Sequence, residues 1–233
     1  MTFFPESGRI SALVMDHDKG DCMRRIAIAL TTLGIMLLGA GSAQAAVLSS
    51  VGGTISYTAD QGERNDVVVG GNTVLGVHVY TFTDADANPI RIGGGLCELI
   101  NGVGTCRTDG VQNFRIDVRD RDDTAQISTF SGGGIFPPFI PAVIIGGRGV
   151  DVLQGGVAGD VLKGNDGRDS LRGRGGADVY KGGRGSDTLQ TLDGQADAFI
   201  SCGNGRRDLI RADKIDPKPK SCELGGRKPG KQF

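Results

Sequence analysis

The stretch that decides the fold runs from Gly146 to Gln190 and reads GGRGVDVLQ, GGVAGDVLK, GNDGRDSLR, GRGGADVYK and GGRGSDTLQ. Each of these five contiguous blocks of nine residues has a glycine-rich first half, an aspartate at its sixth position and an apolar residue at its eighth. The aspartates are Asp151, Asp160, Asp169, Asp178 and Asp187, and the apolar residues are Leu153, Leu162, Leu171, Tyr180 and Leu189. This regularity predicts a repeat architecture in which each block is one structural unit.

Each block is expected to form a tight turn followed by a very short strand. Glycine permits positive φ and close backbone approach, so the first half of a block forms a turn whose carbonyl groups point inward. The three residues after the aspartate, such as Val152 to Gln154, are long enough only for a short strand with its middle side chain on one face. A single block has almost no core, so the blocks must stack to bury their apolar residues.

Two blocks make one coil of a solenoid, which places aspartates eighteen residues apart above one another. We expect Asp151, Asp169 and Asp187 on one edge, and Asp160 and Asp178 on the other. Stacked carboxylates repel one another, and a hard divalent cation with several oxygen ligands removes this repulsion. Calcium suits such a site better than magnesium, which requires a stricter octahedron.

The blocks closely resemble the RTX, or haemolysin-type, calcium-binding nonapeptide repeat, whose pattern is G-G-x-G-x-D-x-U-x. The resemblance implies an all-β, right-handed parallel β-roll or β-helix solenoid, with calcium (Ca²⁺) held between adjacent turns by the aspartates and by turn carbonyl groups. The departures are Ala158, Asn165 and Arg174, which replace glycines. The implied ligands are the side chains of Asp151, Asp160, Asp169, Asp178, Asp187 and Asp197, with carbonyl candidates at Gly147, Gly149, Gly156, Gly164, Gly167, Gly173, Gly176, Gly183 and Gly185.

Residues 46–130 alternate apolar and polar side chains in short runs, which predicts a degenerate β-solenoid or a small β domain. Two segments in this region look like worn copies of the repeat. QGERNDVVV places Asp66 and Val68 at the carboxylate and apolar positions, and VRDRDDTAQ places Asp123 at the carboxylate position with arginines where glycines belong. We interpret both as coils that have lost calcium, with the arginines either replacing the charge of the ion or lying on an exposed strand edge.

Residues 131–145 contain three prolines, which cannot donate to a β-ladder, so we expect an excursion before a strand begins at Ala142. Phe136, Phe139 and Ile140 form an apolar group in this excursion. These side chains either contact a partner or fold back and cap the roll.

The repeat phase slips by one residue after Gln190. The following segments carry Asp197 with Phe199, and Asp208 with Ile210. Terminal repeats of a solenoid are atypical because they close its open end, so we expect residues 191–224 to be degenerate repeats and a cap, with Asp197 completing a site with Asp178. Residues 225–233 are expected to be a basic, solvated tail.

The N-terminal part has the layout of a secretory signal. Residues 23–45 combine an arginine pair, an apolar run and an Ala-Gln-Ala sequence, which predicts a signal peptide cleaved before Ala46. Translation is then expected to start at Met23, with residues 1–22 a non-native upstream extension. A membrane anchor is the alternative, but the apolar run is short of a full span. We therefore expect a secreted, extracellular protein with no membrane span in its mature chain.

Four cysteines remain after cleavage, at Cys97, Cys106, Cys202 and Cys222. An oxidising exterior favours disulfides, and four cysteines allow three pairings. We favour the local pairing, Cys97 with Cys106 and Cys202 with Cys222, which would staple the ends of the solenoid. A zinc site is the alternative, although the cysteines are widely separated and His78 is the one histidine left.

The composition narrows the class of protein. The net charge of −1 gives no attraction toward nucleic acid or an anionic membrane. No nucleophile motif accompanies His78, so we expect no enzyme; a carboxylate-based glycosidase is a remaining alternative, against which the few aromatic residues argue. The sequence predicts a secreted calcium-binding repeat protein. The second hypothesis is an adhesion or partner-binding protein that uses the N-terminal β region, with the repeats as a scaffold and an unidentified extracellular protein as partner.

Overall fold

The computed structural model describes residues 45–74, 77–86, 90–128 and 140–222. These residues form seventeen β-strands, so the predicted all-β class is confirmed for them. They include no helix that is long and apolar enough to cross a membrane. The expected upstream extension, the signal peptide up to residue 44, Phe136, Phe139 and the basic tail lie outside the described residues.

Six strands of the first sheet run parallel to one another and follow the repeat. They are β2 (Thr54–Thr58), β8 (Asn113–Asp117), β10 (Ala142–Gly149), β12 (Val161–Gly167), β14 (Val179–Arg184) and β16 (Phe199–Gly203). The second sheet has six parallel strands that are mostly shorter. They are β3 (Asp66–Val74), β9 (Thr124–Ile127), β11 (Val152–Gln154), β13 (Ser170–Arg172), β15 (Thr188–Gln190) and β17 (Leu209–Arg211).

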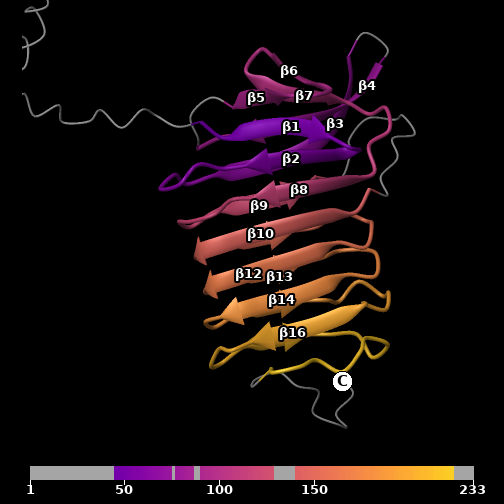
Figure 1. The fold of residues 1–233 in the computed structure, drawn as a ribbon. Coiled ribbons are helices and arrows are strands. Elements are labelled where there is room, and N and C mark those ends of the chain that lie inside the picture. Colours follow the sequence, from indigo (N-terminus) through magenta and orange to yellow (C-terminus); the bar gives the residue numbers. More distant parts are fainter. Residues whose placement is uncertain (1–44, 75–76, 87–89, 129–139, 223–233) are drawn as a thin grey trace, which may run out of the picture. The chain divides into compact units, whose positions relative to one another are not determined.

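Successive strands along the repeats alternate between the two sheets, so one strand from each sheet and the two turns between them make one coil (Figure 1). Residues eighteen apart are partners in neighbouring coils, as Leu153 and Leu171 are in the second sheet and Leu162 and Tyr180 are in the first. We call the turns that follow first-sheet strands the first edge, and the turns that follow second-sheet strands the second edge. The stacking of blocks in pairs is therefore as the spacing predicts.

The strands at the N-terminal end close the stack, mostly with antiparallel pairs. They are β1 (Val47–Val51), β4 (Val77–Asp84), β5 (Arg91–Gly94), β6 (Cys97–Ile100) and β7 (Val103–Arg107). In the first sheet β1 pairs antiparallel with β2 and parallel with β5, and in the second sheet β4, β7 and β6 follow β3 in that order as antiparallel neighbours. Antiparallel pairing changes the strand direction, so the parallel stacking of coils ends here. A disulfide between Cys97 and Cys106 joins β6 to β7.

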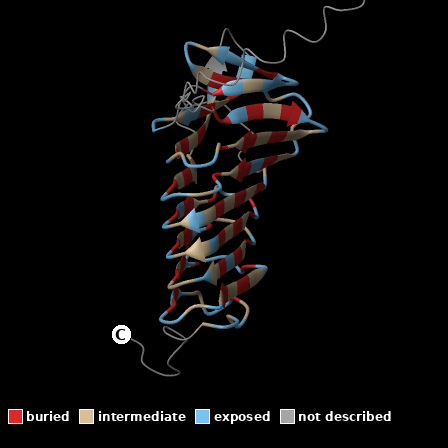
Figure 2. Ribbon diagram, turned by 60° about the vertical axis from the view of Figure 1, so that its left-hand side comes forward, coloured by how far each residue is buried: buried red, intermediate tan, exposed pale blue. Residues whose placement is uncertain are grey.

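The core lies between the two sheets and is narrow along the repeats. The apolar position of each regular block, from Leu153 to Leu189, is completely buried, and buried and partly buried residues alternate along the strands (Figure 2). The core widens toward the N-terminal end, where the ring of Phe114 makes an edge contact with Tyr80 at a centroid distance of 4.9 Å. Buried aromatic residues are therefore concentrated toward the N-terminal end, and Tyr180 is the aromatic residue buried in the regular blocks.

The first worn copy is shifted by one residue from the predicted phase. Asn65, not Asp66, stacks on the next coil, because its backbone N–H donates to Oδ1 of Asp123 at 2.7 Å. The inward apolar residue is consequently Val67 in place of Val68. Burying a neutral amide costs less than burying another carboxylate, and the Asn65 side-chain amide also donates to Asp123. The predicted phase at Asp123 was right.

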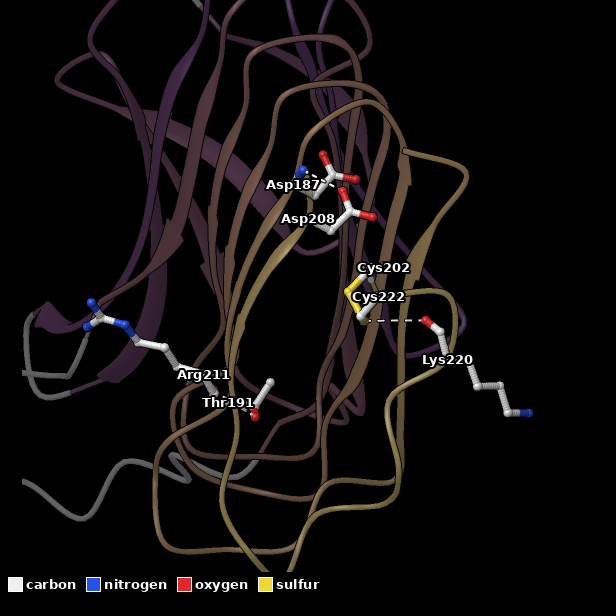
Figure 3. Close-up of a disulfide and its surroundings, with 7 residues drawn as sticks. All are labelled: Asp187, Thr191, Cys202, Asp208, Arg211, Lys220 and Cys222. Atoms are coloured by element: carbon white, nitrogen blue, oxygen red, sulfur yellow. Dashed lines mark hydrogen bonds between the residues drawn. A yellow bond between two sulfur atoms is a disulfide. The ribbon is translucent and has the colours of Figure 1, made fainter. Parts of the chain in front are cut away.

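The C-terminal coils contain one further phase shift. Ile200, not Phe199, faces the core, because Ile200 pairs with the buried Tyr180 of the preceding coil; the N–H groups of Ala198 and Phe199 both approach the carbonyl of Asp178. The predicted positions of Asp208 and Ile210 are as found. The disulfide between Cys202 and Cys222 ties β16 to the segment that follows the last strand, and Lys220 points away from it (Figure 3). The two disulfides thus join the cysteines that are close along the chain, as in the local pairing.

Candidate metal centre

The glycine-rich halves of the blocks bring the coils into close contact at the first edge. Gly149 and Gly167 have φ values of 140° and 147°, a region open essentially only to glycine. A Cβ atom on Gly167 would lie 1.5 Å from the carbonyl oxygen of Gly149, one coil earlier. The same relation holds between Gly185 and Gly167. The turn carbonyl groups therefore point along the stack into the next turn.

At the second position of a block, the residues that replace glycine have smaller positive φ values than Gly147 and Gly183, whose φ values are 124° and 125°. Asn165 and Arg174 have φ values of 75° and 74°, in the left-handed region that Asn tolerates best among non-glycine residues. The Arg174 guanidinium donates to the Gln154 side chain at 2.7 Å and to the carbonyl of Ile127 at 2.6 Å, so it bridges earlier coils. Arginine is thus accommodated at the second edge by hydrogen bonds to its neighbours.

The repeat aspartates form two ladders, one on each edge. On the first edge each backbone N–H donates to Oδ1 of the aspartate one coil later, at 3.0 Å for Asp123 to Asp151, Asp151 to Asp169, Asp169 to Asp187, and Asp187 to Asp208. Figure 3 shows the last of these bonds, with both carboxylates inside the coil. On the second edge the corresponding distances are 2.7 Å for Asp160 to Asp178 and 3.2 Å for Asp178 to Asp197 and for Asp197 to Asp216. All of these carboxylates are buried.

The other carboxylate oxygen of each first-edge aspartate is buried without a hydrogen-bond donor among the described residues. These atoms are Oδ2 of Asp123, Asp151, Asp169, Asp187 and Asp208. In the regular blocks this oxygen faces the first glycine of its own turn, where a Cβ atom on Gly146 would lie 2.3 Å from Oδ2 of Asp151. A row of buried, anionic oxygen atoms without donors is costly unless a cation neutralises it.

On the second edge, some of the carboxylate Oδ2 atoms accept hydrogen bonds from the chain itself. Oδ2 of Asp160 accepts a hydrogen bond from the N–H of Gly156 at 2.6 Å. Oδ2 of Asp178 accepts a hydrogen bond from the Tyr180 hydroxyl at 3.4 Å. The two edges are therefore chemically different, although the sequence repeats the same block on both.

Burial raises the pKa of the aspartates of the five regular blocks above its usual value near 3.8. The pKa of Asp151 rises to about 7, first because of burial and then because of repulsion from Asp169 and Asp123, against the lowering effect of its hydrogen bond from the Asp123 backbone. The pKa values of Asp169 and Asp187 rise to about 6, mainly through burial. The site therefore places several carboxylates where their negative charge is unfavourable without a counter-ion.

These observations fit the ligand chemistry of calcium. Ca²⁺ takes six to eight oxygen ligands from carboxylates and backbone carbonyls in flexible geometry. The first edge offers both kinds of oxygen ligand. The carboxylate Oδ2 atoms lie inside the turns, and carbonyl oxygens of one turn lie against glycines of the next turn. When bound there, Ca²⁺ would supply charge neutralisation between coils.

The glycines proposed as carbonyl ligands are not equivalent. Five of the proposed glycines have positive φ and lie at the second or fourth position of first-edge turns: Gly147, Gly149, Gly167, Gly183 and Gly185. Gly176 has positive φ in a second-edge turn. Gly164 and Gly173 instead occupy first positions, against the carboxylate of their own block, and Gly156 uses its N–H to bind Asp160. Six of the nine proposed glycines are therefore turn residues with positive φ, five on the first edge and one on the second.

Two acidic residues near the C-terminal end belong to this arrangement and were not predicted from the sequence. Asp216 ends the second-edge ladder and accepts a hydrogen bond from Thr191 at 2.9 Å. Asp216 lies 19 residues after Asp197, and Asp197 lies 19 residues after Asp178. This repeated spacing is the feature of the sequence that could have predicted Asp216. Asp193 was also missed, and it approaches Asp178 and Asp197. Nothing in the nonapeptide pattern assigns a ligand to its position.

Comparison with known proteins identifies the repeat. A family model for the RTX calcium-binding nonapeptide repeat matches residues 154–189, in 4 copies. This part of the chain therefore consists of RTX repeats, which bind Ca²⁺. No curated protein and no solved structure matches the chain significantly.

Proposed function

We propose that the chain is a secreted calcium-binding protein whose repeats form a right-handed parallel β-roll ordered by Ca²⁺ between stacked turns. The single observation that carries this proposal is the row of buried first-edge Oδ2 atoms without donors. The repeat match at residues 154–189 supports the identity of the ion. The role is structural, without catalysis.

Binding and folding are coupled in this proposal. Without the ion, the buried carboxylates of one ladder repel one another or must retain protons, and both conditions oppose the stacking of coils at neutral pH. Ca²⁺ binds the stacked state and not the separated turns, so its binding free energy stabilises the fold. The repeats would consequently stay loose in a calcium-poor cytoplasm and order outside the cell.

The secretion part of the proposal rests on two features. The predicted signal peptide precedes the β region, and two disulfides join the cysteines of the mature chain. Disulfides persist in oxidising compartments and are rare in the cytosol. In the proposed roll they act as staples near its two ends.

A calcium titration of the mature chain tests the function. We expect the far-ultraviolet circular dichroism to gain β structure as Ca²⁺ is added to chelator-treated protein, with heat of binding in calorimetry. Mg²⁺ is the control and should give a much smaller change, because its octahedral preference does not suit carbonyl-rich turns. An unchanged spectrum together with no bound calcium excludes the proposal.

A further inference from the structure

The turn between β15 and β16 departs from the nonapeptide pattern and lies beyond residue 189, where the RTX match ends. Thr191 adds one residue, and the second position of the following segment is Asp193 in place of glycine. An aspartate here brings a side-chain carboxylate to a position where the repeat pattern has only a backbone carbonyl. The turn therefore has a different set of possible ligands from the regular blocks.

Asp193 lies beside two carboxylates of the second-edge ladder. One oxygen from each of Asp178, Asp193 and Asp197 lies within 4.8 Å of the other two. Asp178 is completely buried, Asp197 is 7 % exposed, and Asp193 is partly buried. Three carboxylates this close and this shielded from water repel one another strongly.

The hydrogen bonds of these residues leave one oxygen free on two of the three carboxylates. Oδ1 of Asp197 accepts from the Asp178 backbone at 3.2 Å, and Oδ1 of Asp193 accepts from the Gln195 backbone at 2.7 Å. Oδ2 of Asp197 and Oδ2 of Asp193 are both buried without a donor among the described residues. The Oδ2 atom of Asp197 therefore points independently to a bound cation. A carboxylate oxygen this deeply buried normally has a hydrogen-bond donor, and this one has none among the described residues while it lies beside two other carboxylates.

We propose that Asp178, Asp193 and Asp197 form a distinct calcium site, built on three carboxylates, at the C-terminal end of the repeat array. This proposal rests on the proposed function, because it extends calcium binding past the regular blocks. Oxygen-only, carboxylate-rich sites select hard cations such as Ca²⁺, and a higher ligand charge gives tighter binding. The site binds calcium more tightly than the two-carboxylate sites of the regular turns.

The site also connects elements that the repeats alone do not hold. Asp178 directly precedes β14, and Asp197 precedes β16, which carries Cys202 of the C-terminal disulfide (Figure 1). A cation shared by these carboxylates fixes the irregular turn against the last regular coil. The site thereby fixes the C-terminal cap on the array.

Terbium luminescence reports on this part of the second edge. Tb³⁺ replaces Ca²⁺ at oxygen sites and emits when a nearby tyrosine is excited, and the chain has no tryptophan to interfere. The Tyr180 hydroxyl lies 3.4 Å from Oδ2 of Asp178, next to the site. We expect Tyr180→Phe to remove most of the sensitised emission.

Asp193→Asn tests the third ligand. Asparagine keeps the Oδ1 acceptor for the Gln195 N–H and removes one charge, so the turn is preserved. We expect the affinity for Tb³⁺ and Ca²⁺ at this site to fall by about tenfold or more, since the charge of the ligands sets the affinity. Asp166→Asn, in an equivalent turn of the first edge where the carboxylate is partly exposed beside Arg184, is the matched control and should leave the emission unchanged.

Two outcomes separate this inference from the proposed function. Wild-type affinity and emission in Asp193→Asn, while Asp169→Asn still loses calcium, overturn the three-carboxylate site and leave the repeat function standing. A wild-type chain that binds neither Ca²⁺ nor Tb³⁺ overturns both. Circular dichroism of each variant at saturating calcium confirms that the comparison is made on folded protein.

Discussion

The backbone N–H of Asp151 donates to Oδ1 of Asp169, eighteen residues later, at 3.0 Å, while Oδ2 of Asp169 remains buried without a donor among the described residues. One oxygen of the same carboxylate thus joins two coils, and the other is left for a cation. This division of roles recurs at every step of the first-edge ladder from Asp123 to Asp208. It explains how one aspartate per block serves both the backbone and the ion.

Asp169→Asn separates these two roles. The amide keeps an Oδ1 acceptor for the Asp151 N–H but carries no charge, so we expect the calcium-free protein to be more stable by about 1 kcal/mol or more at pH 8. The stabilisation on adding Ca²⁺ should be smaller than in the wild type. Thermal unfolding with and without Ca²⁺ measures both effects, with Asp109→Asn, an exposed carboxylate paired with Arg107 after β7, as the control. A variant less stable than the wild type without calcium contradicts the expectation.

The stability of the calcium-free protein should fall as the pH rises from 3.8 to about 7. The folded-state pKa values of Asp151 and Asp169 are raised to about 7 and about 6 from 3.8, mainly by burial. The folded state therefore binds more protons than the unfolded state between pH 3.8 and about 7, so this contribution is present at low pH and lost as the pH rises through the folded pKa values. Urea unfolding at several pH values in chelator measures the slope.

Calcium should remove this pH dependence and release protons when it binds. The ion requires ionised carboxylates, so binding near pH 6 displaces protons that the folded state holds. Calorimetry in two buffers with different ionisation enthalpies counts the released protons. Equal heats in both buffers are incompatible with raised carboxyl pKa values in the calcium-free state.

Gly167→Ala should prevent normal stacking of the coils. Alanine is strained at a φ of 147°, which alone costs about 1–3 kcal/mol, and its Cβ atom would lie 1.5 Å from the carbonyl oxygen of Gly149. Gly175→Ala is the control, because its φ is not left-handed and the nearest atom is the flexible Gln195 side chain at 3.1 Å; we expect a change of about 0.5 kcal/mol. Urea midpoints at saturating calcium compare the two. Similar losses in both variants would show that turn crowding is not the cause.

Removing the C-terminal disulfide should destabilise the cap. The bond between Cys202 and Cys222 closes a loop with a sequence separation of 20, for which chain entropy predicts a loss of about 3 kcal/mol in the double alanine variant. The bond between Cys97 and Cys106 spans 9 residues within paired strands, so the corresponding double variant should lose less. Hydrogen exchange of β16 and β17 locates the effect, and protection unchanged in these strands argues against a capping role.

The regular blocks were predictable because their geometry is local and repeated. A fixed spacing of nine leaves two alternating edges once two blocks make a coil, so the stacking of Asp151 on Asp169 followed from the sequence. The cysteine pairing was also predictable, because each pair is close along the chain. Two of the glycine departures, Asn165 and Arg174, do not alter the stacking, since they adopt a left-handed backbone that non-glycine residues tolerate.

The sequence by itself determined the all-β class, the coil of two blocks and the aspartates that line its edges. Only the tertiary structure decided the phase at Asn65 and Ile200, because there the strand register depends on hydrogen bonds to the neighbouring coil and not on the local pattern. It also decided that the two edges differ and that Asp193 joins Asp178 and Asp197. These relations depend on which donors and carboxylates from separate coils meet in space, and a block of nine residues does not contain that information.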